Sequence, residues 1–146
     1  MNADYQIPKQ VLILSYSGLI PFVMLGVGAW MTPDVYLQTV NNLLVTYAAC
    51  ILAFMGAIHW GVAMKDRPHS MQLGLSIVPA LLAWLSLNII SPWNYSILIV
   101  SFAVLCIVDG MATIKGLLPD WYPKLRTPLT SIVVLSLISA AIAVIR

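Results

Sequence analysis

The sequence predicts an all-α integral membrane protein, folded as a bundle of five transmembrane helices. Two observations support this class. Of 146 residues, 61% are hydrophobic and only 8% are charged, whereas about 25% are charged in a typical soluble domain. The apolar residues also gather into runs of roughly 20, the length that one helix needs to cross a bilayer. We expect residues 1–146 to form a single transmembrane domain surrounded by lipid.

The expected spans are residues 11–30, 43–64, 71–90, 95–114 and 129–145. The first span could also be a cleaved signal peptide, because Val27-Gly28-Ala29 resembles a cleavage site after an apolar run. The polar lead, residues 1–10, carries one acid and one base rather than a basic cluster, so we favour a retained span. Pro21 lies mid-span and predicts a kink there.

The connectors between the spans differ in length and charge. Residues 31–42 are polar without Lys or Arg, and residues 65–69 form a tight charged loop. Residues 91–94 are so few that the third and fourth spans must form an antiparallel hairpin. Residues 115–128 form the longest basic connector, which precedes the fifth span.

Basic residues indicate the orientation, because Lys and Arg near span ends are retained on the cytoplasmic side. With five spans, only Arg146 falls on one side. Six bases fall on the other: Lys9, Lys65, Arg67, Lys115, Lys124 and Arg126. We therefore expect a cytoplasmic N-terminus and a C-terminus outside.

A histidine and an acid lie within the predicted spans, at the same depth. His59 precedes Lys65 by six residues, and Asp109 precedes Lys115 by six. Both therefore lie roughly 9 Å inside the cytoplasmic boundary, at about 1.5 Å per residue. An unpaired carboxylate there is costly, so Asp109 must pair, take up a proton or face water. His59 is the obvious partner.

Other side chains are candidates for the same polar layer. Tyr16 and Ser17 follow Lys9 by seven and eight residues, which places them only slightly deeper. Trp60 follows His59; an anchoring or packing role is the simpler interpretation, and a stacking platform for a ring is the alternative. The candidate binding residues are therefore His59, Asp109, Tyr16, Ser17 and Trp60.

The chemistry of this layer stays open at the level of sequence. It could be a polar clasp between helices, or a site for a proton, a quinone or another ligand. Haem or metal ligation is less favoured because His59 is the only intramembrane histidine. Cys106, one turn from Asp109, leaves a His/Asp/Cys set open. Cys50 and Cys106 otherwise suggest buried free thiols, and the residues specify no cofactor.

Several function classes are disfavoured. A net charge of +2 gives no electrostatic footprint for nucleic acid. The sequence contains no nucleophile elbow, phosphate-binding glycine loop or zinc-protease motif. We therefore predict no catalytic residue and favour a non-enzymatic protein.

Five stretches together carry a family resemblance: Leu19-Ile20-Pro21-Phe22, Gly56-Ala57-Ile58-His59-Trp60-Gly61, Val78-Pro79-Ala80-Leu81-Leu82-Ala83-Trp84, Asp109, and Leu118-Pro119-Asp120-Trp121-Tyr122-Pro123-Lys124-Leu125-Arg126. With them the chain resembles the small multi-span proteins grouped with mitochondrial transmembrane protein sixty-nine, a domain-of-unknown-function family. The resemblance implies a helical membrane bundle and, because many members are bacterial, a multi-pass protein of the bacterial inner membrane. It implies no activity and no catalytic residue.

Three functional hypotheses follow. The first is an accessory or assembly partner of a membrane complex, whose partner would be another membrane protein or a second copy of this chain. The second is a proton-sensitive carrier or quinone-like binding protein that uses His59 and Asp109. It predicts a cavity that reaches His59, with Asp109 and Tyr16 in its wall. The third is a membrane enzyme or redox protein.

Overall fold

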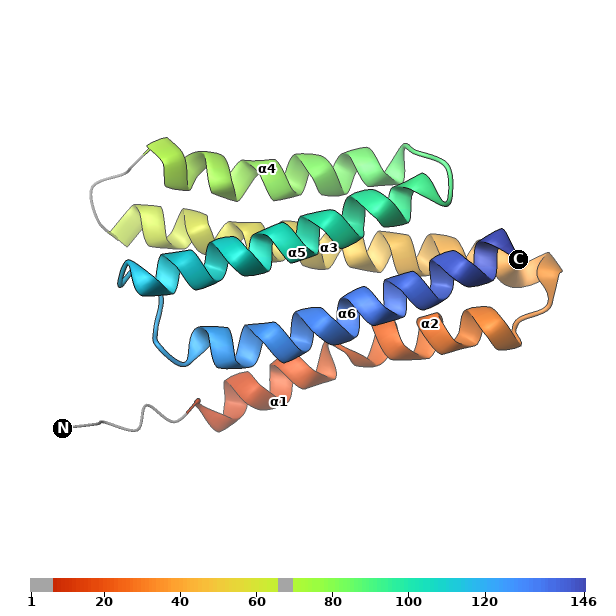
Figure 1. Cartoon of the computed structure of the whole chain (residues 1–146), viewed down its shortest axis with the longest axis horizontal. Helices are drawn as coiled ribbons and strands as arrows, with labels where there is room; N and C mark the ends of the chain where they lie inside the picture. Colours follow the sequence, from red (N-terminus) through yellow and green to blue (C-terminus); the bar gives the residue numbers. More distant parts are fainter. Residues whose placement is uncertain (1–6, 66–69) are drawn as a thin grey trace.

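A computed structural model describes residues 7–65 and 70–146 of the chain. Within these residues the fold is entirely helical (Figure 1). The helices in chain order are α1 (Lys9–Ser17), α2 (Ile20–Met31), α3 (Asp34–Lys65), α4 (Ser70–Leu87), α5 (Trp93–Ile114) and α6 (Tyr122–Ile145). The predicted all-α bundle is confirmed.

The helices run back and forth along one axis as five passes, with α1 and α2 together forming the first (Figure 1). Four segments of the described chain are long and apolar enough to cross a membrane: Lys9–Met31, Asp34–Met64, Trp93–Ile114 and Tyr122–Ile145. The remaining pass, α4, is shorter, with an apolar helix over Leu73–Leu87. An odd number of passes places the start of α1 and the end of α6 at opposite ends of the bundle.

The first pass is broken rather than only kinked. α1 ends at Ser17 and α2 begins at Ile20, so that Pro21 lies in the first turn of α2. Proline has no backbone N–H, and a continuous helix would need that donor for the carbonyl of Ser17, four residues earlier. The interruption therefore falls one turn before the residue at which the sequence predicted a kink.

Several span boundaries differ from the predicted ones. α3 begins at Asp34, nine residues before the predicted span, and its acidic first turn suits the positive end of the helix dipole. α6 begins at Tyr122 rather than residue 129, because Pro123 occupies the first turn, where proline is favoured. The connector before α6 is therefore only residues 115–121. α4 ends at Leu87, where the Asn88 side-chain amide donates to the carbonyl of Trp84 at 2.8 Å.

Large side chains of α2, α3, α5 and α6 fill the centre of the bundle. Phe22 of α2 packs edge to face on Phe102 of α5, with ring centroids 6.2 Å apart, and on Tyr47 of α3 at 5.1 Å. Leu52 and Leu137 are fully buried in the same cluster. Many large apolar side chains instead cover the outside of the bundle, a surface that water disfavours and that acyl chains solvate.

Two helix pairs approach closely at glycines. At Gly56 of α3, an added Cβ would lie 2.9 Å from the carbonyl oxygen of Ser76 in α4. At Gly26 of α2, it would lie 3.0 Å from the carbonyl oxygen of Ser136 in α6. These contacts fix α4 against α3, and α2 against α6.

The predicted burial of the thiols is wrong for Cys50, which is exposed on the outside of the bundle, while Cys106 is partly buried. Both are free. Cys50 therefore faces the lipid and not the core. Of the charged loop predicted over residues 65–69, residues 66–69 lie outside the described part of the chain.

Candidate functional site

Three ionisable side chains from three helices meet inside the bundle. Asp109 of α5 accepts from Nε of Arg126 in α6, with 2.8 Å between Nε and Oδ2. Its other oxygen, Oδ1, lies 2.9 Å from Nε2 of His59 in α3. The exposed fractions are only 2% for His59, 1% for Asp109 and 5% for Arg126. We refer to these three residues as the buried triad.

The structure brings His59 and Asp109 together, as their matching depths predicted. His59 lies six residues before the end of α3, and Asp109 five residues before the end of α5. Those two helix ends lie at the same end of the bundle (Figure 1). Since a carboxylate can only accept hydrogen bonds, Nε2 of His59 is the donor in this contact.

Arg126 is the member that sequence reasoning missed as a site residue. The prolines of the LPDWYPKLR stretch predict a loop, which places Arg126 among the cytoplasmic bases. Because α6 begins at Tyr122, Arg126 instead lies one turn inside a helix and reaches Asp109. The signal that could have found it is the buried carboxylate itself, which requires a cation nearby.

The triad leaves part of the Arg126 guanidinium without a partner. Both oxygens of Asp109 are engaged, but Nη2 of Arg126 is buried and has no hydrogen-bond partner among the described residues. The same is true of the hydroxyl of Tyr122 and of Oγ1 of Thr130. These three residues recur at every fourth position of α6, so they share one face of the helix.

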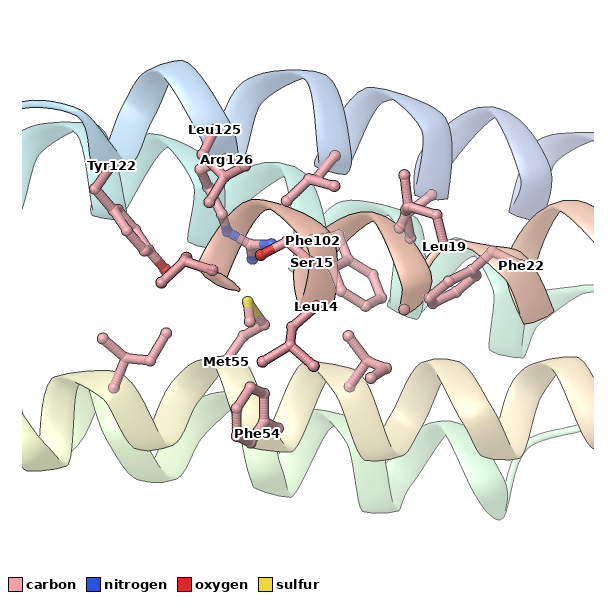
Figure 2. Close-up of a pocket in the computed structure, with 16 residues that line it drawn as sticks. Leu14, Ser15, Leu19, Phe22, Phe54, Met55, Phe102, Tyr122, Leu125 and Arg126 are labelled. Atoms are coloured by element: carbon pink, nitrogen blue, oxygen red, sulfur yellow. The ribbon is translucent and has the colours of Figure 1, made fainter. Parts of the chain in front are cut away.

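A cavity of about 440 Å³ opens beside this face. Its walls come from α1, α2, α3, α5 and α6 and are almost entirely apolar, including Leu14, Phe54 and Phe102. Figure 2 shows Tyr122 and Arg126 reaching from α6 into one end of the cavity, with Met55 of α3 facing them. The cavity is therefore an apolar pocket whose wall includes the polar side chains of Ser15, Tyr122 and Arg126.

The remaining predicted site residues lie on the outside of the bundle. Tyr16 and Trp60 are 42% and 45% exposed. Ser17 is also exposed, and its hydroxyl donates to the carbonyl of Leu14 at 2.8 Å. The hydroxyl groups that line the pocket are those of Tyr122 and Ser15.

The pocket does not have the wall that the second hypothesis predicted. His59, Asp109 and Tyr16 do not line it. It reaches the triad through Arg126 alone. The polar contacts that connect the pocket with His59 run through Arg126 and Asp109.

A second, polar hollow lies at the opposite end of the bundle, with a volume of about 720 Å³. Its wall includes the side-chain amides of Gln38, Asn41, Asn42 and Asn94. The hydroxyl of Ser91 is 2.9 Å from Oδ1 of Asn41 and 3.1 Å from Oδ1 of Asn94. No charged side chain of the described residues lines the hollow, and several of its amides hydrogen-bond to one another or to Ser91.

The sequence left open a metal centre formed by His59, Asp109 and Cys106. In residues 7–65 and 70–146, no three side chains of His, Cys, Asp and Glu gather as metal ligands. Asp109 instead uses both oxygens for His59 and Arg126. The triad is therefore an Asp109–Arg126 ion pair to which His59 is hydrogen-bonded, and not a set of metal ligands.

Residues 7–142 match the family described as "Protein of unknown function (DUF3429)". This chain belongs to the DUF3429 family. The family resemblance drawn from the sequence motifs is thereby confirmed. Together, the family match and the long apolar helices show a multi-pass membrane protein.

Two relatives extend the comparison. The chain is 34% identical over 143 residues to Transmembrane protein 69 of Xenopus tropicalis, covering 92% of this chain and 54% of that protein. It is 24% identical over 135 residues to Transmembrane protein 69 of Mus musculus, covering 90% and 55%. The chain thus spans about half the length of the curated relatives it matches. No solved structure matches it.

Proposed function

We propose that this protein is a non-enzymatic membrane protein that binds a small lipophilic molecule carrying an oxygen head group, such as a quinone. The observation that carries the proposal is the unpartnered Nη2 of Arg126 at the polar end of an apolar pocket. A ligand oxygen placed there would accept the hydrogen bond that no described residue of the chain accepts.

The size and lining of the pocket support a small ligand. Its volume of about 440 Å³ lies within the range of about 300–1,000 Å³ that is usual for small-molecule sites. Such sites combine apolar walls with a few fixed polar groups. Here the donors of Arg126 and Tyr122 would orient the head group, while Phe54 and Phe102 would contact the ring or tail.

The energetics of the buried donors also support an occupant. Leaving a buried donor without an acceptor costs about 1–3 kcal/mol, and more when the group is charged. A bound carbonyl oxygen would remove that cost for Nη2 of Arg126. Since Asp109 already neutralises Arg126, a neutral head group adds no charge to the site.

The test is binding of decylubiquinone to the purified protein in a non-ionic detergent, measured by titration calorimetry. Leu129→Trp fills the pocket, while Leu135→Trp places the same residue on the exposed face of the same helix. We expect roughly tenfold weaker binding for Leu129→Trp or worse, which is about 1.4 kcal/mol, and unchanged binding for Leu135→Trp. Equal affinities for the two variants, or no binding by the unmodified protein, would overturn the proposal.

An accessory or assembly role is the second candidate, and a specific surface supports it. Ala57 and Gly61 are exposed on α3 at a spacing of four, and no atom lies within 4 Å of a Cβ added at Gly61. Small residues in this arrangement allow another helix to approach closely within a bilayer. The partner would be another membrane protein or a second copy of this chain.

Purification in mild detergent tests this role. Gly61→Leu should release a partner or dissociate an oligomer, whereas Gly74→Leu on α4, also in open space, should not. Identical complexes from both variants would contradict it.

We further propose that the protein lies in a bacterial inner membrane with its N-terminal side in the cytoplasm. Lys9, Lys65, Lys115 and Lys124 support this orientation, because all four belong to the end of the bundle where α3 and α5 end.

A further inference from the structure

We propose that the pocket accepts an anionic head group only together with one proton, which is held on His59. The inference rests on the proposed ligand-binding function and adds a charge rule to it. Neutral lipophilic ligands would bind without a proton. Lipophilic anions would bind with one, so that the buried site stays neutral.

The geometry supplies a continuous connection from the pocket to His59. Arg126 lines the cavity and is bonded through Nε to Oδ2 of Asp109. The second oxygen of the same carboxylate meets Nε2 of His59. Asp109 therefore lies between the cation that would bind the head group and the imidazole, and all three are at least nine-tenths buried.

Counting charges shows why an anion requires the proton. With a neutral imidazole, Asp109 and Arg126 cancel, and the triad carries no net charge. An anion bound at Nη2 of Arg126 would then leave one uncompensated negative charge in a buried, apolar setting, which is strongly unfavourable. With an imidazolium at position 59, the empty triad carries one positive charge, and the bound anion cancels it.

The proton has a definite place on the ring. Nε2 of His59 already carries the hydrogen that faces Asp109, since the carboxylate only accepts. The additional proton would bind Nδ1 and leave the Nε2 contact in place. Asp109 would then stabilise the imidazolium directly, because it lies 2.9 Å away.

Few other ionisable groups can take over this role. From α5, His59 faces Asp109, with Cys106 one turn earlier; from α6 it is approached through Arg126 and Tyr122. The sequences of α2 and α4 contain no ionisable side chain. On α3 itself the nearest is Lys65, whose side chain is outside the described part of the structure, as are residues 66–69.

The experiment compares a permanent anion with a neutral ester of similar length. Decanesulfonate and methyl decanoate are titrated calorimetrically into the purified full chain between about pH 6 and about pH 8, where histidine changes charge. Neither probe titrates in this range. Two buffers with different ionisation enthalpies are used at each pH, so that the protons taken up per bound ligand are counted. Leu129→Trp gives the contribution of partition into detergent micelles.

For the sulfonate we expect up to one proton taken up per ligand, and an affinity that falls by up to about tenfold per pH unit as pH rises. For the ester we expect no proton uptake and no dependence on pH. In His59→Gln, which keeps a donor toward Asp109 but cannot hold the proton, sulfonate binding should fall at every pH to the level seen with Leu129→Trp, whereas binding of the ester should be unchanged. If that variant does not fold, the proton count of the unmodified protein decides.

The outcomes separate the two proposals. Sulfonate binding without proton uptake, or ester binding with it, overturns the charge rule and leaves the pocket as a ligand site. Ester binding with no sulfonate binding at any pH also overturns the charge rule alone. Absence of binding by both probes, beyond what Leu129→Trp shows, overturns the proposed function as well.

Discussion

Nε of Arg126 lies 2.8 Å from Oδ2 of Asp109, with both side chains buried and the two residues 17 positions apart in the sequence. The contact ties the end of α5 to the start of α6 across the connector of residues 115–121. Because both side chains are buried, water cannot solvate either charge, and each charge is stabilised by its partner. The stability of the bundle should therefore respond sharply to changes at either residue.

Asp109→Asn should destabilise the protein by about 3–5 kcal/mol, because it leaves the buried guanidinium without a counter-charge. Thermal unfolding in detergent, followed by circular dichroism, measures the effect. Asp120→Asn makes the same chemical change at an exposed position and should have little effect. Similar losses in both variants would contradict a buried ion pair.

Replacing both members of the pair should cost less than replacing one. Asp109→Leu with Arg126→Met removes both charges and leaves apolar side chains, a change that is often neutral or stabilising for a buried pair. The double variant should unfold at a higher temperature than either single variant. If the double variant instead lost as much stability as the two single variants together, the two charges would not depend on each other.

Gly56→Ala should loosen the contact between α3 and α4. Its Cβ would lie 2.9 Å from the carbonyl oxygen of Ser76 and 3.0 Å from Cβ of Pro79, and relieving such overpacking costs about 1–3 kcal/mol. Gly61→Ala on the same helix meets no atom within 4 Å and should not lower stability. An unfolding temperature for Gly56→Ala equal to that of Gly61→Ala would rule out the close approach.

Reporter fusions test the orientation inferred from the basic residues. In a bacterial inner membrane, alkaline phosphatase fused after Arg146 should be active, and green fluorescent protein fused there should be dark. Insertion of the same reporters into residues 115–121 should give the opposite result, since that connector lies at the other end of the bundle. The reverse pattern at both positions would invert the predicted topology.

The sequence was sufficient for the fold class because composition and span length depend on the solvent, not on detailed packing. It also identified the His59–Asp109 contact, since two residues at equal distances from the same boundary share a depth. Depth alone does not say which way a side chain points. Tyr16 and Ser17 therefore share that depth yet face outward, while Ser15 lines the pocket.

Helix boundaries near proline were the weakest inference. A proline in the interior removes a backbone hydrogen bond and kinks or breaks a helix, whereas a proline in the first turn is favoured. Pro21 and Pro123 both occupy first turns in the structure. Taking Pro123 as part of a loop removed Arg126 from the predicted membrane interior, and with it the cation of the triad and the polar end of the pocket.

The length of α3 sets the position of the protein relative to the water phase. Its 32 residues extend about 48 Å at 1.5 Å per residue, whereas the hydrocarbon layer is about 30 Å thick. With the end that carries His59 near one face of the membrane, the surplus length, led by Asp34, would project beyond the other. The amide-lined hollow around Asn41 and Asn42 would then lie among lipid head groups, so the protein would present a hydrated vestibule on the side of the membrane opposite its buried ion pair.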